Sequence, residues 1–347
     1  MRLPNVRIPR KGPRDVTGKR IGIISTGSYL PKEEVGNEEV ATRVGVTAEW
    51  IERKTQIVSR RYAAPHEATS DLAARAAERA LEQAGLTAED IDYLIVSTST
   101  GDYPQPPTSY LVQDALGAYR AACLDVNVVC SGFVYALEVA RGLARTRPGS
   151  RVLVIGADLY SRILDFGDRR TAVLFADGAG AAVLGPVDEP YGIIGTDLVS
   201  RGDAHDLIRV EAGGSRNPTS EATLAEGGHY FRMNGRGVRD FVSEHVPPAL
   251  TALADRVGVG MAAVDHFVPH QANGVMLGEV VGLAGLTGAV THRTLQKYGN
   301  VGSASVPVAL DEANRSGALT PGDLVLLAGF GGGMSIGASL LRWGVTA

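Results

Sequence analysis

The chain is poor in cysteine, has no long apolar run and carries no excess of positive charge. Its 347 residues include two cysteines, Cys123 and Cys130, which excludes a disulfide framework and suits a reduced, intracellular setting such as the cytoplasm. No apolar stretch approaches the roughly 18 residues that a membrane span needs. The formal net charge of −4 argues against a nucleic-acid-binding surface. We therefore expect a cytoplasmic protein that binds neither membranes nor nucleic acids.

Two common kinds of cofactor site are also missing. Cys123 and Cys130 lie seven positions apart and no histidines cluster with them, so the ligand spacing of a zinc site is absent. Residues 176–180 superficially resemble a nucleotide-binding loop, but a strand-like apolar run at 181–184 follows them where such a loop needs a helix. The sequence predicts neither a bound metal nor a dinucleotide cofactor.

Seven basic residues crowd the first twenty positions, and no apolar segment accompanies them. A secretory signal needs such a segment, and the prolines at positions 4, 9 and 13 disfavour the amphipathic helix of a transit peptide. We interpret residues 1–19 as an N-terminal extension of the folded part.

The sequence repeats itself at an offset of 173 residues, half the length of the chain. The clearest match places residues 148–156 on residues 321–329, and shorter matches share the same offset. We therefore expect two related α/β halves, residues 20–185 and 186–347, each of ordinary domain size. The second half contains a polar, Gly-rich segment, 201–229, which we interpret as a loop or a cap over a site.

Hydrophobic periodicity predicts strands that alternate with helices. A helix start is predicted at Thr47, a residue type that caps helix N-termini. The second-half helix is expected to break at Pro247-Pro248. The predicted strands lie at 21–24, 91–97, 151–155, 266–269 and 324–328, and the predicted helices at 37–44, 47–54, 70–83 and 235–257.

Cys130 stands at a predicted turn from a strand into a helix. An apolar run precedes it and a helix-like stretch, 131–140, follows it. The N–H groups and dipole of a helix N-terminus favour a thiolate, the nucleophilic form of cysteine. On its position alone, packing as a small apolar residue explains Cys130 equally well.

The repeat connects Cys130 with two further polar residues. At the offset of 173, Cys130 falls on Ser303, Asn127 on Asn300, and Ser97 on His270. If a pseudo-twofold axis relates the halves, His270 and Asn300 face Cys130 across it. Taken singly, His270 fits a surface loop and Asn300 fits turn chemistry beside a glycine. Together they predict a Cys-His-Asn site built from both halves.

The motifs around these residues, taken together, resemble those of the 3-oxoacyl-(acyl carrier protein) synthase III family. The resemblance covers about residues 20–345. It implies the thiolase-like α/β fold, in which two duplicated halves form a layered αβαβα subunit, and it implies a homodimer. The motifs that carry it lie at 129–133, 175–181, 269–273, 299–300 and 331–333.

The resemblance implies a reaction in two steps. An acyl-CoA acylates Cys130 while the backbone N–H groups of Cys130 and Gly332 hold the oxyanion; Gly331-Gly332-Gly333 would also fit a flexible turn. A malonyl thioester, on acyl carrier protein in the family, then loses CO₂ to give an enolate stabilised by His270 and Asn300. The enolate attacks the acyl-cysteine and gives a 3-oxoacyl thioester, as in the initiation of fatty-acid or polyketide synthesis. The coenzyme A thioester is a substrate, and no cofactor is implied.

The resemblance also implies the residues that bind substrate. Trp50 and Arg162 match positions that sandwich the adenine of coenzyme A by stacking and cation contacts. Lys54 and Asn273 are expected beside the same coenzyme. Gln105, which would come from the partner subunit, and Phe330 are expected at the acyl pocket.

The chain departs from the family at its expected docking face for carrier protein. Lys54 replaces an arginine and loses the planar guanidinium. Asp240 falls where the family has a lysine, and Val275 lies where a basic residue is frequent, although Arg236 and Arg239 are near. These changes motivate an alternative, a synthase III-like acyltransferase that moves the acyl group from the cysteine to a hydroxyl or an amine in a natural-product pathway.

Two features favour condensation over the alternatives. Decarboxylation needs both His270 and Asn300, whereas simple acyl transfer needs only a base. A catalytically silent partner subunit, the third possibility, would be expected to lose Cys130.

Gln105 offers a test of the expected acyl pocket. A polar side chain there suits a short or polar acyl group, so Gln105→Phe is expected to shift the chain-length preference. The measurement is the rate of enzyme acylation with a series of acyl-CoAs, and an unchanged profile would remove Gln105 from the pocket.

Overall fold

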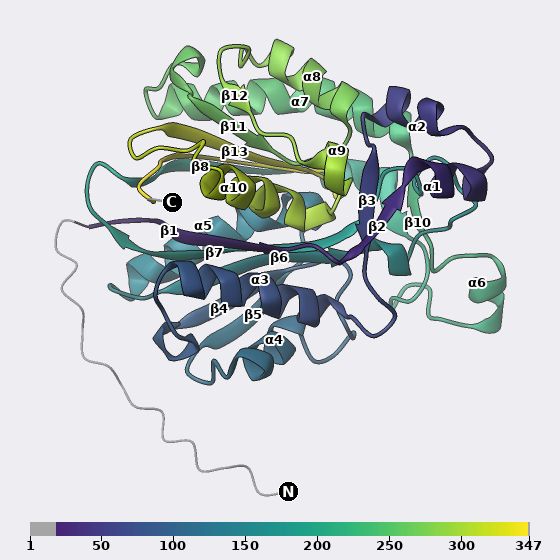
Figure 1. Ribbon diagram of the computed structural model, residues 1–347, viewed down its shortest axis with the longest axis horizontal. Helices are drawn as coiled ribbons and strands as arrows, with labels where there is room; N and C mark the ends of the chain where they lie inside the picture. Colours follow the sequence, from purple (N-terminus) through teal and green to yellow (C-terminus); the bar gives the residue numbers. More distant parts are fainter. Residues whose placement is uncertain (1–18, 346–347) are drawn as a thin grey trace, which may run out of the picture.

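Two five-stranded mixed sheets form the framework of the protein (Figure 1). The structure, a computed structural model, describes residues 19–345, so the expected N-terminal extension lies outside the described residues except for Lys19. In spatial order the first sheet contains β1 (Arg20–Tyr29), β7 (Asp177–Val187), β6 (Val152–Leu159), β4 (Tyr93–Ser97) and β5 (Ala122–Val126). The second contains β8 (Gly192–Ser200), β14 (Ser335–Arg342), β13 (Leu324–Gly331), β11 (His266–Pro269) and β12 (Val290–Thr291).

The two sheets have the same strand order and the same strand directions. In each, the third and fourth strands pair in parallel, as do the fourth and fifth, and the second strand runs antiparallel to the third. This correspondence confirms the duplication that the 173-residue repeat predicts.

Helices cover both sheets and fill the space between them, which gives the expected αβαβα layers (Figure 1). The central layer contains α5 (Gly132–Thr146) and α10 (Ser305–Arg315). One outer layer contains α3 (Thr69–Gln83) and α4 (Thr108–Leu116), and the other contains α7 (Gly235–Arg256) and α8 (Gly274–Leu283).

The composition of the central elements explains these layers. The first turns of α5 are apolar on most sides, as expected for a helix that lies between two sheets. Phe133, Val134 and Leu137 in these turns are fully buried. All eight residues of β6 are buried as well, as expected for a strand whose sheet is covered on both faces. Each large apolar side chain buried here contributes about 1.5–3 kcal/mol to folding.

Most of the helices and strands expected from the sequence are confirmed. Thr47 caps α2 (Ala48–Thr55) by accepting a hydrogen bond from the Trp50 N–H. The expected break at Pro247-Pro248 is wrong, because α7 continues through both prolines. Pro248 is exposed, whereas Val246, Pro247 and Leu250 pack in the core, and this packing keeps the helix continuous despite the missing hydrogen bonds.

Small elements surround this framework. Two two-stranded pairs stand outside the main sheets, β2 (Glu33–Gly36) with β3 (Ser59–Tyr62) and β9 (Ile208–Val210) with β10 (Phe231–Met233). The remaining helices are α1 (Asn37–Val44), α6 (Glu221–Ala225) and α9 (Leu295–Tyr298). The 3₁₀ turns are η1 (Ala88–Asp90), η2 (Val129–Ser131), η3 (Tyr160–Arg162), η4 (Gly202–Leu207), η5 (Met261–Ala263) and η6 (Gly302–Ala304).

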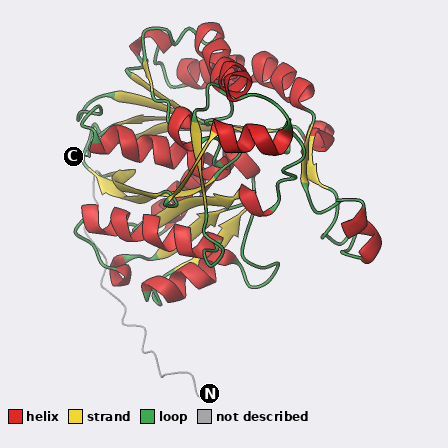
Figure 2. Ribbon diagram, turned by 45° about the vertical axis from the view of Figure 1, so that its right-hand side comes forward, coloured by secondary structure: helices red, strands yellow, loops and turns green. Residues whose placement is uncertain are grey.

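Segment 201–229 includes η4, β9 and α6. Helix α6 projects from the body of the molecule, whereas β9 and its partner β10 stay close to it (Figure 2). No helix within residues 19–345 has the length and apolar character that crossing a bilayer would require.

Two glycines allow a test of how tightly the halves meet. A Cβ atom at Gly156 in β6 would lie 2.5 Å from the Ser303 carbonyl oxygen, a backbone atom of the other half. Gly156→Ala is therefore expected to destabilise the fold by about 1–3 kcal/mol or more, measured by chemical denaturation. In the matched control Gly142→Ala, in α5, the new methyl group meets open space, so stability should rise by about 0.5–1 kcal/mol. Equal effects of the two substitutions would contradict the close contact.

Candidate active site

Cys130 lies in η2, at the turn that leads from β5 into α5, and is buried. The residue before it, Val129, has a φ of +45°, a left-handed conformation that is strained for a β-branched side chain. On the facing strand β13, a Cβ atom at Gly331 would lie 2.7 Å from the Cβ of Cys130. The sharp turn and the glycine together let the cysteine side chain fit against the end of the second half.

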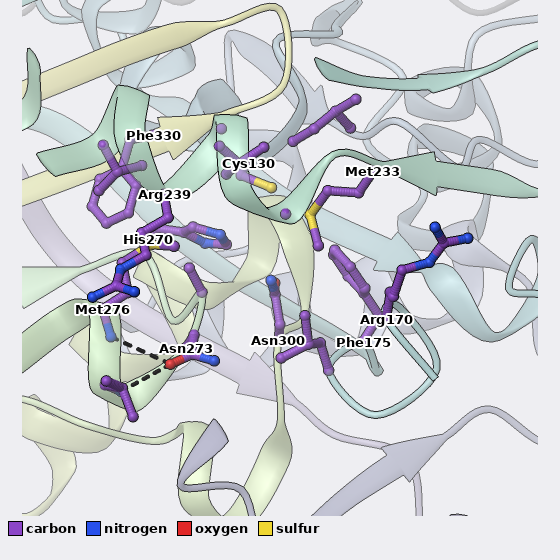
Figure 3. Close-up of a pocket in the computed structure, with 18 of the residues that line it drawn as sticks. Cys130, Arg170, Phe175, Met233, Arg239, His270, Asn273, Met276, Asn300 and Phe330 are labelled. Atoms are coloured by element: carbon purple, nitrogen blue, oxygen red, sulfur yellow. Dashed lines mark hydrogen bonds between the residues drawn. The ribbon is translucent and has the colours of Figure 1, made fainter. Parts of the chain in front are cut away.

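Cys130 opens onto a cavity of about 520 Å³ (Figure 3). Buried residues from both halves form its floor, among them Cys130, His270, Asn300 and Phe330. The walls are mainly apolar. Four exposed basic residues line the part of the cavity that lies nearer to solvent, namely Arg53, Lys54, Arg170 and Arg239.

His270 follows the end of β11, and its backbone N–H donates to the Ala328 carbonyl over 2.7 Å. Its ring packs edge to face against Phe330, with 5.5 Å between the ring centroids. Burial lowers the pKa of His270 to about 3, against a smaller opposing effect of the Gly302 backbone. The neutral ring therefore carries a single N–H, and its Nδ1 is buried without a partner among the described residues.

Asn300 is held by its own backbone and by its side-chain oxygen. Its N–H donates to the Leu174 carbonyl and its carbonyl accepts from the Ala176 N–H, each over 2.8 Å. Oδ1 accepts from the Gly302 N–H over 3.0 Å, which turns the amide NH₂ toward the cavity (Figure 3). Asn300 is thus placed as a hydrogen-bond donor.

The thiol of Cys130 is surrounded by groups with opposite effects on its charge. Burial, together with the negative charge of Asp158, raises its pKa to about 12. The Tyr160 hydroxyl and the backbone N–H groups of Gly332 and Cys130 have a smaller opposing effect and lower the pKa of the thiol.

The pseudo-twofold counterpart of the cysteine–histidine pair lies nearby. Ser97 and Ser303, the residues equivalent to His270 and Cys130, share a buried hydrogen bond of 2.6 Å between their hydroxyl oxygens. The axis inferred from the repeat therefore relates these turns in space, and the nucleophile occupies one of two equivalent places.

Comparison with known proteins now identifies the family. The family model of 3-oxoacyl-[acyl-carrier-protein] synthase III matches residues 124–202, and that of its C-terminal part matches residues 254–343. A β-ketoacyl-[acyl-carrier-protein] synthase III from Symbiobacterium thermophilum is 43% identical over 93% of this chain and 98% of its own. The chain belongs to the synthase III family.

Other relatives show the range of this family. An acetoacetyl CoA synthase from a Streptomyces species is 52% identical over 94% of this chain and all of its own length. The crystal structure of 3-oxoacyl-(acyl carrier protein) synthase III from Pseudomonas aeruginosa has a TM-score of 0.87 and 34% identity, and the match covers 94% of this chain and 99% of that one. The protein is thus a synthase III-type condensing enzyme with the thiolase-like fold, and an acyltransferase of that kind.

The residues expected to bind coenzyme A divide into two groups in this synthase III. Lys54 and Asn273 line the cavity. The amide of Asn273 is already engaged, since Oδ1 caps α8 by accepting from Val275 and Met276, and Nδ2 donates to the Lys54 carbonyl over 3.0 Å. Asn273 therefore joins α8 to α2, whereas the Lys54 ammonium has no ion-pair partner within residues 19–345.

Trp50 and Arg162, which are expected to sandwich the adenine, both lie outside the lining of the cavity. The Arg162 guanidinium donates to the carbonyls of Ala64 and Glu67 and does not line the cavity. Arg169 instead lies over the Trp50 ring, 6.0 Å from its centroid. Gln105 is exposed and lies outside the cavity of its own subunit, whereas Phe330 lines it.

Sequence reasoning missed several features of this site. Arg53 and Arg170 line its rim, and no motif distinguished them from other surface arginines. Gln56, where the family usually has glycine, keeps the left-handed conformation with a φ of 60° and ends α2. Within residues 19–345, no three histidine, cysteine or acidic side chains gather to hold a metal.

Burial of His270 has a consequence for stability in acid. Below pH 6.5 the unfolded chain binds a proton at this histidine, whereas the folded chain does so only near pH 3, so stability falls as the pH drops through this interval. His270→Gln should make the decline shallower by up to about 1.4 kcal/mol per pH unit. His292, whose pKa burial lowers to about 4, adds a decline of the same sign that the variant retains.

The measurement is the free energy of unfolding at several pH values between 7 and 4. The control is His205→Gln, which replaces an exposed histidine in η4 and should keep the wild-type slope. Identical slopes for all three proteins would show that His270 is not held neutral.

Proposed function

We propose that Cys130 accepts an acyl group from acyl-CoA and that His270 and Asn300 then direct condensation with a malonyl thioester. The observation that carries the proposal is the convergence of these three buried side chains, from both halves, on the floor of one cavity. Simple storage of an apolar ligand would not require them.

Acylation uses the backbone around the nucleophile. The sulfur attacks the thioester carbon, and the carbonyl oxygen takes up negative charge. The N–H groups of Cys130 and Gly332, which favour negative charge on the sulfur, would donate to that oxygen. The basic rim formed by Arg53, Lys54 and Arg170 suits the phosphates of coenzyme A.

Decarboxylation calls for neutral hydrogen-bond donors. A malonyl thioester loses CO₂ as its electrons move toward the thioester carbonyl oxygen, where enolate charge develops. The NH₂ of Asn300 and the single N–H of the neutral His270 would stabilise that oxygen. The enolate carbon then attacks the acyl-cysteine and releases the Cys130 sulfur.

We further propose that coenzyme A carries the malonyl group and that the product is acetoacetyl-CoA, formed from acetyl-CoA in the cytoplasm. A relative 52% identical over 94% of this chain is an acetoacetyl CoA synthase. On the rim formed by α7 and α8, Arg239 is paired with Glu279, Asp240 is exposed and Val275 is apolar. This face therefore lacks the excess of positive charge that would attract an acidic carrier protein.

A homodimer is part of the proposal. Strand β5 is at the edge of its sheet, and an open edge invites pairing with a second copy. Two large aromatic side chains, Tyr103 and Tyr110, are 62% and 52% exposed close to β5 and α4. Pairing here would also bring the loop of Gln105 toward a partner subunit.

The alternative of acyl transfer to a hydroxyl or an amine keeps the acylation of Cys130. This alternative gives the Asn300 amide no role, although hydrogen bonds of its backbone and of its Oδ1 fix its position. Condensation uses both donors and is the better supported function.

The deciding experiment follows the mass of the intact protein after addition of a panel of acyl-CoAs. Wild type and Cys123→Ala, the matched control, should both gain one acyl group, whereas Cys130→Ala should gain none. Malonyl-CoA or a malonyl-carrier protein is then added, and CO₂ and 3-oxoacyl thioester are measured. Asn300→Ala should still be acylated, with condensation reduced about 10²–10³-fold.

The outcomes separate the candidate functions. Turnover with malonyl-CoA alone supports acetoacetyl-CoA synthesis, and turnover with the carrier-protein thioester alone contradicts the choice of coenzyme A. An acyl-enzyme that survives both malonyl thioesters and discharges only to a hydroxyl or an amine establishes the acyltransferase instead.

A further inference from the structure

The rim of the cavity contains a junction between two helices from different halves of the chain. The C-terminal end of α2, in the first half, meets α8, in the second half (Figure 1). Helix α2 carries Arg53 and Lys54, α8 carries Val275 and Met276, and all four residues line the cavity. The position of α2 on α8 therefore decides where the two cations of α2 stand.

Two neighbouring pairs of residues form this junction. The first pair is Asn273 and Lys54, in which Nδ2 donates to the lysine carbonyl over 3.0 Å. The second pair is Gln56 and Gly274, the buried first residue of α8. A Cβ atom at Gly274 would lie 2.3 Å from Oε1 and 2.6 Å from Cβ of Gln56. The glutamine side chain thus fills the space that the glycine leaves.

The Gln56 amide is also held from its other side. Arg293, in the loop between β12 and α9, donates from Nη1 to Oε1 of Gln56 over 3.3 Å. Its second guanidinium nitrogen, Nη2, lies over the next turn of α8, where a Cβ atom at Gly278 would be 3.9 Å away. The amide is therefore fixed between the arginine and the start of α8.

The turn at the end of α2 does not itself call for glutamine. Gln56 ends this helix with a φ of 60°, and its N–H donates to the Glu52 carbonyl over 2.7 Å. Glycine adopts this left-handed conformation without strain, whereas a residue with a Cβ atom does not. What the glutamine side chain adds is its contact with Gly274 and its hydrogen bond with Arg293.

We propose that Gln56 is a positioning residue that fixes α2 on α8 and thereby holds the Lys54 ammonium where it binds a phosphate of coenzyme A. Lysine has a flexible stem, and no ion pair within residues 19–345 fixes that of Lys54. The reach of its ammonium is therefore set by the backbone of α2. The inference rests on the proposed function, in which a coenzyme A thioester acylates Cys130.

The test compares Gln56→Gly with wild type. The dissociation constant of coenzyme A, measured by calorimetry, should rise about tenfold, the equivalent of one hydrogen bond to a charged group. The KM for acetyl-CoA should rise in proportion while kcat stays at the wild-type value, because the contact with phosphate is the same throughout the reaction. The midpoint of chemical denaturation should not fall, since glycine relieves the turn.

A truncated substrate separates this role from a general effect on the site. S-Acetyl-N-acetylcysteamine has the thioester but no phosphate, so Gln56→Gly and wild type should be acylated by it at the same rate. Lys54→Met should weaken coenzyme A binding, and adding Gln56→Gly to it should cause little further loss. Losses that simply add would show that Gln56 does not act through Lys54.

A second pair of variants tests the contact at the junction. Gly274→Ala places a methyl group on the Gln56 side chain and should weaken coenzyme A binding as well. In Gln56→Gly the three nearest atoms are gone, so the added methyl group should cause no further loss. The matched control is Gly282→Ala, in the last turn of α8, where the methyl group meets open space and binding should be unchanged.

The outcomes distinguish this inference from the proposed function. Unchanged coenzyme A binding in Gln56→Gly, or an equal loss with the truncated thioester, would overturn the positioning role and leave the condensing activity standing. If Gly274→Ala alone does not fold, its rescue by Gln56→Gly supports the contact. Wild type that binds coenzyme A but is never acylated would refute the proposed function, while the dissociation constants still test Gln56.

Discussion

The close approach of the two halves at the pseudo-twofold axis is the constraint on which the site depends. Gly156 and Gly329 are equivalent under the repeat, and a Cβ atom at either would come within 2.5 or 2.8 Å of the backbone of the opposite turn, at Ser303 or Ser131. Each helix N-terminus therefore rests on the central strand of the other half. Any side chain larger than hydrogen at these glycines would separate the turns, and with them the cysteine of one half from the histidine and asparagine of the other.

Symmetry of the framework makes the differences between the two turns informative. Asp158 and Gly331 occupy equivalent places: the carboxylate of Asp158 accepts the Ser303 N–H, whereas Gly331 leaves room for the Cys130 side chain. The turn at Cys130 carries the nucleophile, and the turn at Ser303 supports it. At the second turn, the Ser97–Ser303 hydrogen bond stands in place of a reactive pair. Duplication supplied two similar turns, and chemistry requires only one of them to be reactive.

The sequence predicted what depends on local pattern and on the repeat. Hydrophobic periodicity located α1 and β11 to the residue, and the offset of 173 linked Cys130 with His270 before any contact was visible. Spacing along the chain does not show which of several nearby arginines contacts a given aromatic ring. Arg162 and Arg169 are seven positions apart, and only the path of the loop between η3 and β7 brings Arg169 over Trp50.

Desolvation explains why the side chains of this site act as neutral hydrogen-bond donors. Burial acts in opposite directions on an acid and a base, so the same dry cavity floor raises the pKa of Cys130 and lowers that of His270. Burial therefore disfavours both the thiolate and the imidazolium of a charged cysteine–histidine pair. The histidine is thereby kept as a neutral donor, which suits an enolate oxygen.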